Sequence, residues 1–586
     1  MTRYLRIAGR CAAVLTAGTI ILLALAVGLF RLMLPVVPEY REQIEAAASD
    51  FLGRPVALGT IDARWRFGGP ELTFKDTTVY TADGSEVLAN ADLVRVGLSV
   101  LHYVRTRQLR PGRVTFEGMN VNVVRTADNR FFLSGRQVWP ASGGDGELPI
   151  GVFSLKDTTL TYADEALSSG IRVFSQIDID LELRRDGLQL EGSTELPAGL
   201  GDEIEFNARA DGDLTAFSSV VWRAGINADA IDLGGLASLL RDSLGSVTAG
   251  QGDVLLSGRF RGAEPRQLSA SIDLDNVALA VPTGDTVAYG RLAGRFDWDG
   301  LSDGWQAFAR EVEVERNGER WTADAWRFEY GRSGDDTVLY ASADALRAED
   351  LVPLAALAPD ADWRRRLFAL AVEGDVRDLE ASSTRSGTVQ TRYLLSGAFS
   401  GLGWDAEGAL PGVRGLDATV RIDEHGGRLE VAPSAVAVTL DKLFDAAVPT
   451  EAVEGTVIWR KGTAGWRVLS DNLALDTAAF RSRTSFELEL PEGDAAPNLD
   501  LQTDLTGVGI AAATALLPTR VLKPKLASWL DSALVGGRID SGSVAFSGPL
   551  DAFPFDDGEG RFRAEASFSD LTMAYAPGWP EAREAS

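Results

Sequence analysis

The stretch from Cys11 to Phe30 holds twenty residues without a charge. At about 1.5 Å per residue, a helix of this length spans the roughly 30 Å hydrocarbon core of a bilayer. Arg3, Arg6 and Arg10 precede the stretch, and arginines before a span favour a cytoplasmic N-terminus. The sequence therefore predicts a single-pass anchor that places the rest of the chain across the membrane. The residues assigned to this anchor are Cys11, Ile20, Leu23 and Phe30.

A cleaved secretory signal is the alternative explanation of the same stretch. Ala24, Leu25 and Ala26 resemble the small-residue cleavage site that follows a short apolar core. We favour an uncleaved anchor because the apolar run continues from Val27 to Phe30. Both explanations place the body of the chain outside the cytoplasm.

The formal net charge of −27 argues against nucleic-acid binding, which needs basic patches, and against broad adhesion to anionic lipid headgroups. The only cysteine is Cys11, so the body has no disulfide framework. The two histidines, His102 and His425, have no ligand or catalytic partner at a recognisable spacing. We therefore expect no metal site and no cofactor.

Beyond Val56 the apolar residues alternate with polar ones, which is typical of strands with one buried face. Turn signals such as Asp83-Gly84 and Asn317-Gly318 separate the alternating runs. This pattern predicts a mainly β protein built on an antiparallel sheet with one apolar and one polar face. A short amphipathic helix is expected before the strands, over 38–52. Other helical segments, near 231–244, 348–370 and 510–534, are expected to cover an end or a side of the sheet.

Two internal echoes indicate a sheet that grows by repetition. Phe74-Lys75-Asp76-Thr77-Thr78-Val79 recurs as Leu155-Lys156-Asp157-Thr158-Thr159-Leu160, at an offset of 81. At an offset of 161, the pair Gly304-Trp305 recurs as Gly465-Trp466, with a further tryptophan at the same spacing before each. Repeated strand units each contact mainly their neighbours.

The carboxylates are numerous enough for a paired-acid hydrolase. Asp178 and Asp180 are the candidates, but they alternate with Ile177, Ile179 and Leu181. The solvated face of a strand explains this alternation more simply than catalysis does. We therefore predict no catalytic residue and do not expect an enzyme.

Short motifs at both ends of the chain point to one family. Gly53-Arg54-Pro55-Val56 follows the predicted helix, and the C-terminal part carries Trp529-Leu530-Asp531, Phe553-Pro554-Phe555 and Ala576-Pro577-Gly578-Trp579-Pro580. Over nearly the whole chain, this succession resembles the AsmA-like family and its YhdP branch in particular.

The resemblance implies a periplasmic protein, anchored in the inner membrane, with a long, curled and open β-groove. The implied role is to carry phospholipid between the inner and outer membranes and so to support the outer-membrane barrier. The expected domains are a cytoplasmic tip and anchor (1–35), an AsmA-like helix and strands (36–141), and a YhdP-like groove with helical insertions (149–586), with a linker from Ser142 to Gly146. Relatives run further, so we expect a fragment or a short form with an outer-membrane or periplasmic protein partner at its C-terminal end.

A lipid groove also agrees with the empty inventory of catalytic groups, because acyl chains are held by burial at roughly 0.8 kcal/mol per CH₂. The expected partners are membrane phospholipids, with no nucleic acid. The residues expected to line the groove are Val96, Leu98, Val121, Val123, Ile272, Leu274, Leu488 and Leu501.

Two other functions fit the alternation of the strands. In the first, the apolar face is a sealed core and the protein is a periplasmic scaffold that assists outer-membrane protein assembly. In the second, which we favour least, strand carboxylates hydrolyse a glycan. An open and a sealed apolar face give the same alternating sequence.

Overall fold

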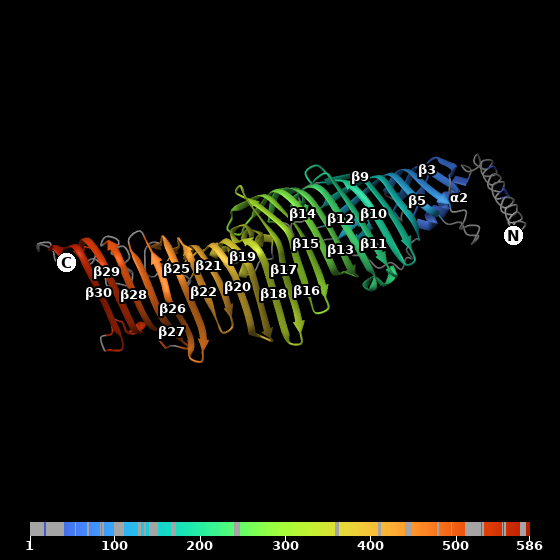
Figure 1. The fold of residues 1–586 in the computed structure, drawn as a ribbon. Helices are drawn as coiled ribbons and strands as arrows, with labels where there is room; N and C mark the ends of the chain where they lie inside the picture. Colours follow the sequence, from blue (N-terminus) through green and yellow to red (C-terminus); the bar gives the residue numbers. More distant parts are fainter. Residues whose placement is uncertain are drawn as a thin grey trace, which may run out of the picture. The chain divides into compact units, whose positions relative to one another are not determined.

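A computed structural model describes most of the chain after residue 40. The described residues are 17–18, 28, 40–52, 54–66, 69–81, 84, 87–98, 111–126, 130–133, 136–139, 150–165, 171–239, 246–357, 362–407, 412–439, 448–477, 480–493, 495–509, 529, 532–553, 555, 558–574 and 582–585. They form two compact units, unit 1 from residues 1–245 and 249–274 and unit 2 from residues 246–248 and 275–586. Figure 1 labels strands and helices of both units.

Unit 1 is mainly a sheet. Its alternating apolar and polar residues suit antiparallel strands, which have one apolar and one polar face. Its elements are α2 (Arg41–Leu52), β1 (Val56–Ala57), β2 (Ile61–Arg66), β3 (Gly69–Tyr80), β4 (Val87–Leu98), β5 (Pro111–Arg125), β6 (Phe131–Leu133), β7 (Arg136–Trp139), β8 (Gly151–Asp164), β9 (Ile171–Arg184), β10 (Gly187–Glu195), β11 (Glu203–Asp211), η2 (Leu214–Ser219), β12 (Val221–Asp232), α4 (Leu233–Leu239) and most of β13 (Val247–Arg261).

Strand β14 (Glu264–Ala280) contributes residues to both units, and unit 2 continues from it with the same strand-and-turn pattern. The elements of unit 2 are β15 (Thr286–Leu301), β16 (Gly304–Arg316), β17 (Glu319–Ser333), β18 (Asp336–Arg347), α6 (Ala348–Leu351), η3 (Val352–Leu357), α7 (Asp362–Leu370), β19 (Glu373–Ser386), β20 (Val389–Trp404), β21 (Gly412–Asp423), β22 (Gly426–Ser434), β23 (Ala437–Thr439), β24 (Val448–Pro449), β25 (Ala452–Gly462), β26 (Gly465–Asp476), β27 (Arg481–Pro491), β28 (Asn498–Gly509), β29 (Leu534–Pro549), η4 (Leu550–Ala552), β30 (Arg561–Met573) and β31 (Ala582–Ala585).

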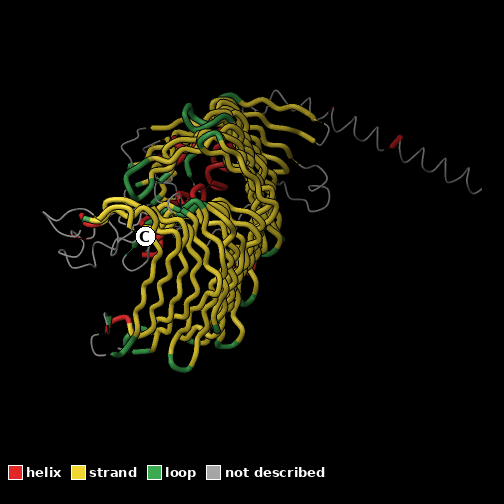
Figure 2. Tube along the Cα trace, turned by 60° about the vertical axis from the view of Figure 1, so that its left-hand side comes forward, coloured by secondary structure: helices red, strands yellow, loops and turns green. Residues whose placement is uncertain are grey.

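The mainly β, antiparallel prediction is confirmed, with one exception. Successive strands pair antiparallel, as Figure 2 shows for the strands running side by side with turns at their ends, but β5 pairs parallel with β8. The short strands β6 and β7 branch from β5 and leave its other edge to β8. Within each unit the described pairings give an open sheet, so the predicted curl is not confirmed.

Both sequence echoes correspond to repeated structure. Asp76 in β3 and Asp157 in β8 adopt left-handed backbone conformations, with φ of 50° and 48°. A short polar side chain tolerates this conformation better than a branched one. In β8 it coincides with a register shift against β9, between Leu155 and Thr158. The tryptophan echo falls on two hairpins, β15–β16 and β25–β26, each closed by a two-residue turn.

The helix predictions are confirmed where the structure describes them. Helix α2 fills most of 38–52, α4 begins two residues later than expected, and α6, η3 and α7 form the broken segment expected over 348–370. Most of 510–534 lies outside the described residues, as do His102 and the Ser142–Gly146 linker. The predicted domain limits stay a prediction.

The anchor residues Cys11, Ile20, Leu23 and Phe30 also lie outside the described residues. Within the part of the chain that is described, no helix has the length and apolarity needed to cross a membrane. The anchor therefore stays a prediction from the sequence.

Candidate functional site: the apolar face of the sheet

The strand register of unit 1 lines up apolar residues from strand to strand. Starting at Ile61 in β2, each cross-strand partner on the same face is apolar or glycine as far as Leu256 in β13. We call this line the unit 1 apolar row. Its members are Ile61, Phe74, Val94, Phe116, Leu155, Ile179, Gly192, Phe206, Ile226 and Leu256.

Unit 2 has an equivalent line that is longer. It starts at Trp298 in β15 and reaches Gly548 in β29 without a polar residue. At roughly 4.8 Å per strand it is on the order of 60 Å long, measured along the sheet. The members of this unit 2 apolar row are Trp298, Ala307, Phe328, Ala341, Ala381, Leu395, Ile422, Gly427, Trp459, Val468, Leu488, Leu499 and Gly548.

Large side chains in both rows remain accessible to solvent. Ile226 and Leu256 are 42% and 43% exposed in unit 1, and Phe328 is 41% exposed in unit 2. Contiguous apolar residues left open in this way usually mark a binding surface, because burial of such a surface lowers the free energy. The apolar face of each unit is therefore a candidate functional site.

Aromatic rings on this face lie flat across glycines of the neighbouring strand. A Cβ built on Gly192 would lie 2.6 Å from Cζ of Phe206, and one on Gly427 would lie 2.2 Å from Cζ2 of Trp459. Real Cβ atoms do not approach other atoms so closely, so each ring occupies the space that a side chain would need. Both pairs belong to the apolar rows, so in each row an aromatic ring covers a position that has no side chain of its own.

At the start of unit 1 a helix covers the apolar face. Ile44 and Ala48 of α2 pack against a buried cluster that includes Phe74 and Val94 of the unit 1 apolar row. The Glu45 carboxylate fixes the helix by accepting a 2.8 Å hydrogen bond from the backbone N–H of Leu58. This bond and the neighbouring guanidinium of Arg41 outweigh burial and lower the pKa of Glu45. The open part of the face therefore begins beyond this helix.

At β29 and β30 the chain covers its own apolar face with phenylalanines from the connecting segment. The Phe555 ring lies against Gly548 and Gly560, and a Cβ on either glycine would come within 3.0 Å of it. Phe553 packs edge-on against Phe555, with ring centroids 5.8 Å apart, and is itself 51% exposed. The Phe553–Phe555 motif therefore occupies the end of the unit 2 apolar row.

A buried polar cluster holds the helical segment α6–η3 against the sheet of unit 2. The buried carboxylate of Asp350 accepts hydrogen bonds from Nε1 of Trp321 (2.8 Å) and from the Arg316 guanidinium (3.2 Å). Tyr289 donates its hydroxyl to the Asp350 carbonyl at 2.6 Å, and burial raises the pKa of this tyrosine. Hydrogen bonds to Asp350 thus hold the segment against the sheet, in addition to any apolar contact.

The predicted lining residues have apolar cross-strand partners wherever the structure describes a pairing and the side chains. Val96 and Val121 pair with apolar residues on both neighbouring strands, and Val123 is half-buried. The side chain of Leu98 lies outside the described part of the structure.

The remaining predicted lining residues lie in strands that follow β13 in the sequence. Ile272 is half-buried and Leu274 is buried in β14. Leu488 belongs to the unit 2 apolar row, and Leu501 lies in the adjacent row between two phenylalanines. Apart from Leu488, the row members, Phe328 and Ile226 among them, were missed because their register cannot be read from the alternation.

The carboxylates proposed for hydrolysis are held by structural partners. Asp178 accepts hydrogen bonds from the backbone N–H of Asp157 (2.9 Å) and from Nζ of Lys156 (3.2 Å). Asp180 accepts 2.5 Å and 3.4 Å bonds from Ser154 and Lys156. Burial alone would lower the pKa of Lys156. The two carboxylates have the larger effect, so the pKa of Lys156 is raised overall. The strand face explains both aspartates without a reaction.

No other chemical centre is evident in the residues that the structure describes. His425 sits exposed in the β21–β22 turn, where its backbone N–H donates to the Asp423 carboxylate. Among the described residues, no three of His, Cys, Asp and Glu are grouped so that they could hold a metal ion.

Comparison with known proteins gives one family. The family model described as "YhdP protein" matches residues 1–586. The intermembrane phospholipid transporter YhdP of Escherichia coli (strain K12) is 21% identical over 612 aligned residues, which cover 96% of this chain and 45% of that protein. The chain thus spans less than half the length of this relative. No solved structure matches.

Proposed function

This chain belongs to the YhdP family, and from that premise we propose that the apolar face of its sheet binds and conducts the acyl chains of phospholipids. The observation that carries the proposal is the unit 2 apolar row, which crosses from Trp298 to Gly548 without a polar residue. The name of the related transporter supports the choice of phospholipid as the ligand.

The physical chemistry of the face suits an acyl chain. Burial of each CH₂ contributes roughly 0.8 kcal/mol and requires no directional bond, so a chain can shift along the row with little change in free energy. The rings of Phe206 and Trp459 fill the space beside Gly192 and Gly427, so no side chain can stand at these two positions. The headgroup stays in water, beside the acyl chains.

We place this activity in the periplasm, with residues 1–35 as an inner-membrane anchor and transfer between the inner and outer membranes as the role. The charge-free stretch from Cys11 to Phe30 supports the anchor. An outer-membrane or periplasmic protein at the C-terminal end completes the proposed route. Maintenance of the outer-membrane barrier follows from it.

The sealed scaffold is the second candidate, and two observations favour it locally. Helix α2 covers the apolar face over β3 and β4, and Phe555 covers it at β29. In a scaffold the whole face would be closed in this way. The exposure of Phe328 and Ile226 favours the lipid-binding function over the scaffold.

A photo-crosslinking experiment tests the proposal on the full chain in cells. A benzophenone amino acid is placed at Leu501, which pairs with Phe486 and Phe546 on the apolar face, or at the adjacent Gln502 on the polar face. We expect phospholipid adducts at position 501 and none at 502. Equal labelling at the two positions, or no lipid adduct at 501, would favour the scaffold.

A further inference from the structure

Three arginines stand directly opposite one another on the polar face of unit 1. Arg209 of β11 pairs with Arg223 of β12, which pairs in turn with Arg259 of β13. All three side chains are exposed. Like charges directly opposite each other on neighbouring strands destabilise a sheet, so a row of three needs an explanation. The need is greater in a chain with 84 acidic and 57 basic residues.

The protein itself neutralises little of this charge. Arg209 contacts Asp211 at 3.5 Å, but in the part of the chain that the structure describes neither Arg223 nor Arg259 forms an ion pair. Arg467, on a comparable exposed strand of unit 2, reaches Glu487 at 2.9 Å and Glu489 at 3.0 Å. The arginine row of unit 1 therefore leaves guanidinium donors available to an external group.

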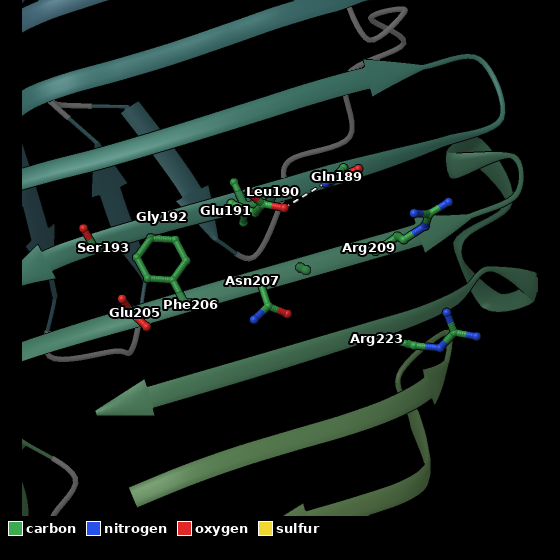
Figure 3. Close-up of a pocket in the computed structure, with 11 residues that line it drawn as sticks. Gln189, Leu190, Glu191, Gly192, Ser193, Glu205, Phe206, Asn207, Arg209 and Arg223 are labelled. Carbon is green, nitrogen blue, oxygen red and sulfur yellow. Dashed lines mark hydrogen bonds between the residues drawn. The ribbon is translucent and has the colours of Figure 1, made fainter. Parts of the chain in front are cut away.

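A hollow of about 560 Å³ adjoins two of these arginines (Figure 3). The side chain of Asn207 lies over Gly225, where a Cβ would come within 3.1 Å of Nδ2. The glycine thus leaves room for the amide beside the arginines. The polar residues around the hollow are Gln189, Glu191, Ser193, Glu205, Asn207, Arg209 and Arg223.

We propose that Arg209, Arg223 and Arg259, together with Asn207, bind a phosphate group. A guanidinium fork matches the oxygen geometry of phosphate, and several phosphate oxygens can accept from neighbouring arginines at once. The residues Asn207 and Arg209 alternate with Phe206 and Ala208, so the site lies on the opposite face from the unit 1 apolar row. The four proposed ligand side chains therefore lie on the face opposite the acyl-chain surface, and Gly192 and Phe206 of the unit 1 apolar row also border the hollow.

Calorimetric titration of the purified full chain with inorganic phosphate tests the site. Wild-type chain should bind phosphate saturably, and the double variant Arg223→Gln/Arg259→Gln should bind it more weakly, by about tenfold per arginine. The control is Arg184→Gln, which removes an exposed arginine from the same face that has its own partner, Glu182, at 3.8 Å. Thermal unfolding checks that all variants fold.

No saturable binding by the wild-type chain, or an equal loss in Arg184→Gln, would overturn the proposal. A flotation assay with phosphatidylcholine vesicles, with and without phosphatidylglycerol, then identifies the source of the phosphate. Arginine-dependent flotation with phosphatidylglycerol assigns the site to a lipid headgroup, and phosphate binding without flotation assigns it to a soluble phosphate ester. Crosslinking at Leu501 should be unchanged in these variants, so the two proposals fail separately.

Discussion

The backbone N–H of Asp157 donates a 2.9 Å hydrogen bond to the carboxylate of Asp178 on the adjacent strand. Asp157 is the bulged residue of β8, so its amide has lost its place in the regular ladder, and the aspartate replaces the missing acceptor. The same device recurs elsewhere in the sheet, which indicates that these carboxylates stabilise bulges. Two further examples are Ala230 with Asp253 and Gly401 with Asp417.

We predict that Asp178→Ala lowers the free energy of unfolding by about 1–3 kcal/mol, because the Asp157 amide loses its acceptor. Asp178→Asn keeps an acceptor oxygen and should recover most of this loss. Urea unfolding of the purified variants measures the effect. Lipid adducts at position 501 should be unaffected in both variants. If Asp178→Asn abolishes function at normal stability, the carboxylate has a chemical role and the hydrolase alternative returns.

Acid should weaken the β8–β9 pair through Asp180. The hydrogen bond from Ser154 and the charge of Lys156 outweigh burial and lower the pKa of Asp180. Because the folded pKa lies below the unfolded value of about 3.9, the stabilisation is complete above that value and is lost as the pH falls through the folded pKa. Urea midpoints measured down the acid range should fall less steeply in Ser154→Ala than in the wild type. An unchanged slope would contradict the assignment.

Much of the fold could be predicted because strand periodicity and turn residues are local signals. The β15–β16 and β25–β26 hairpins follow from the two echoed tryptophan segments, and α2 follows from apolar spacing and a stop at Gly53-Arg54-Pro55. The parallel pairing of β5 with β8 could not be foreseen. It depends on which edge of β5 the short strands β6 and β7 leave free, and alternation contains no information about edges.

The sequence predicts that the candidate site is an apolar sheet face, but not which residues line up on it. Alternation places Leu488 on an apolar face, but the row that joins it to Trp459 and Phe328 depends on register across many strands. Each bulge shifts that register, and the apolar pattern of the sequence does not reveal where a bulge occurs. Phe555 was noted as part of a family motif, yet its place against Gly548 depends on how the segment folds back on the sheet.

The Trp459 ring over Gly427 gives a prediction that tests whether the shape of the apolar row, and not only its apolar composition, controls lipid binding. Gly427→Ala places a methyl group where the Trp459 ring lies, so the ring must tilt out of the row. We expect a loss of about 1–3 kcal/mol in unfolding free energy from overpacking, together with weaker lipid crosslinking at position 501.

Two controls accompany Gly427→Ala. A Cβ at Gly462 would meet only one atom, at 3.6 Å, so Gly462→Ala should change stability by less than about 0.5 kcal/mol. Adding Trp459→Leu to Gly427→Ala should restore crosslinking by removing the tilted ring. If the double variant labels as poorly as Gly427→Ala alone, the ring does not control the surface.

A charge in the middle of the unit 2 apolar row should stop conduction. Leu488 pairs with Val468 on one side and Leu499 on the other, so Leu488→Glu puts a carboxylate between two apolar neighbours. An acyl chain passing this point would have to desolvate the charge, which costs far more than the burial of one CH₂ provides. Because Leu488 is only half-buried, its strand pairing should survive.

Cells that carry Leu488→Glu should become permeable to large antibiotics while the variant accumulates normally. Leu488→Met preserves the apolar row, and Gln502→Asp adds a charge to the opposite face, so both should leave the barrier intact. A normal barrier in Leu488→Glu cells would remove this residue from the path.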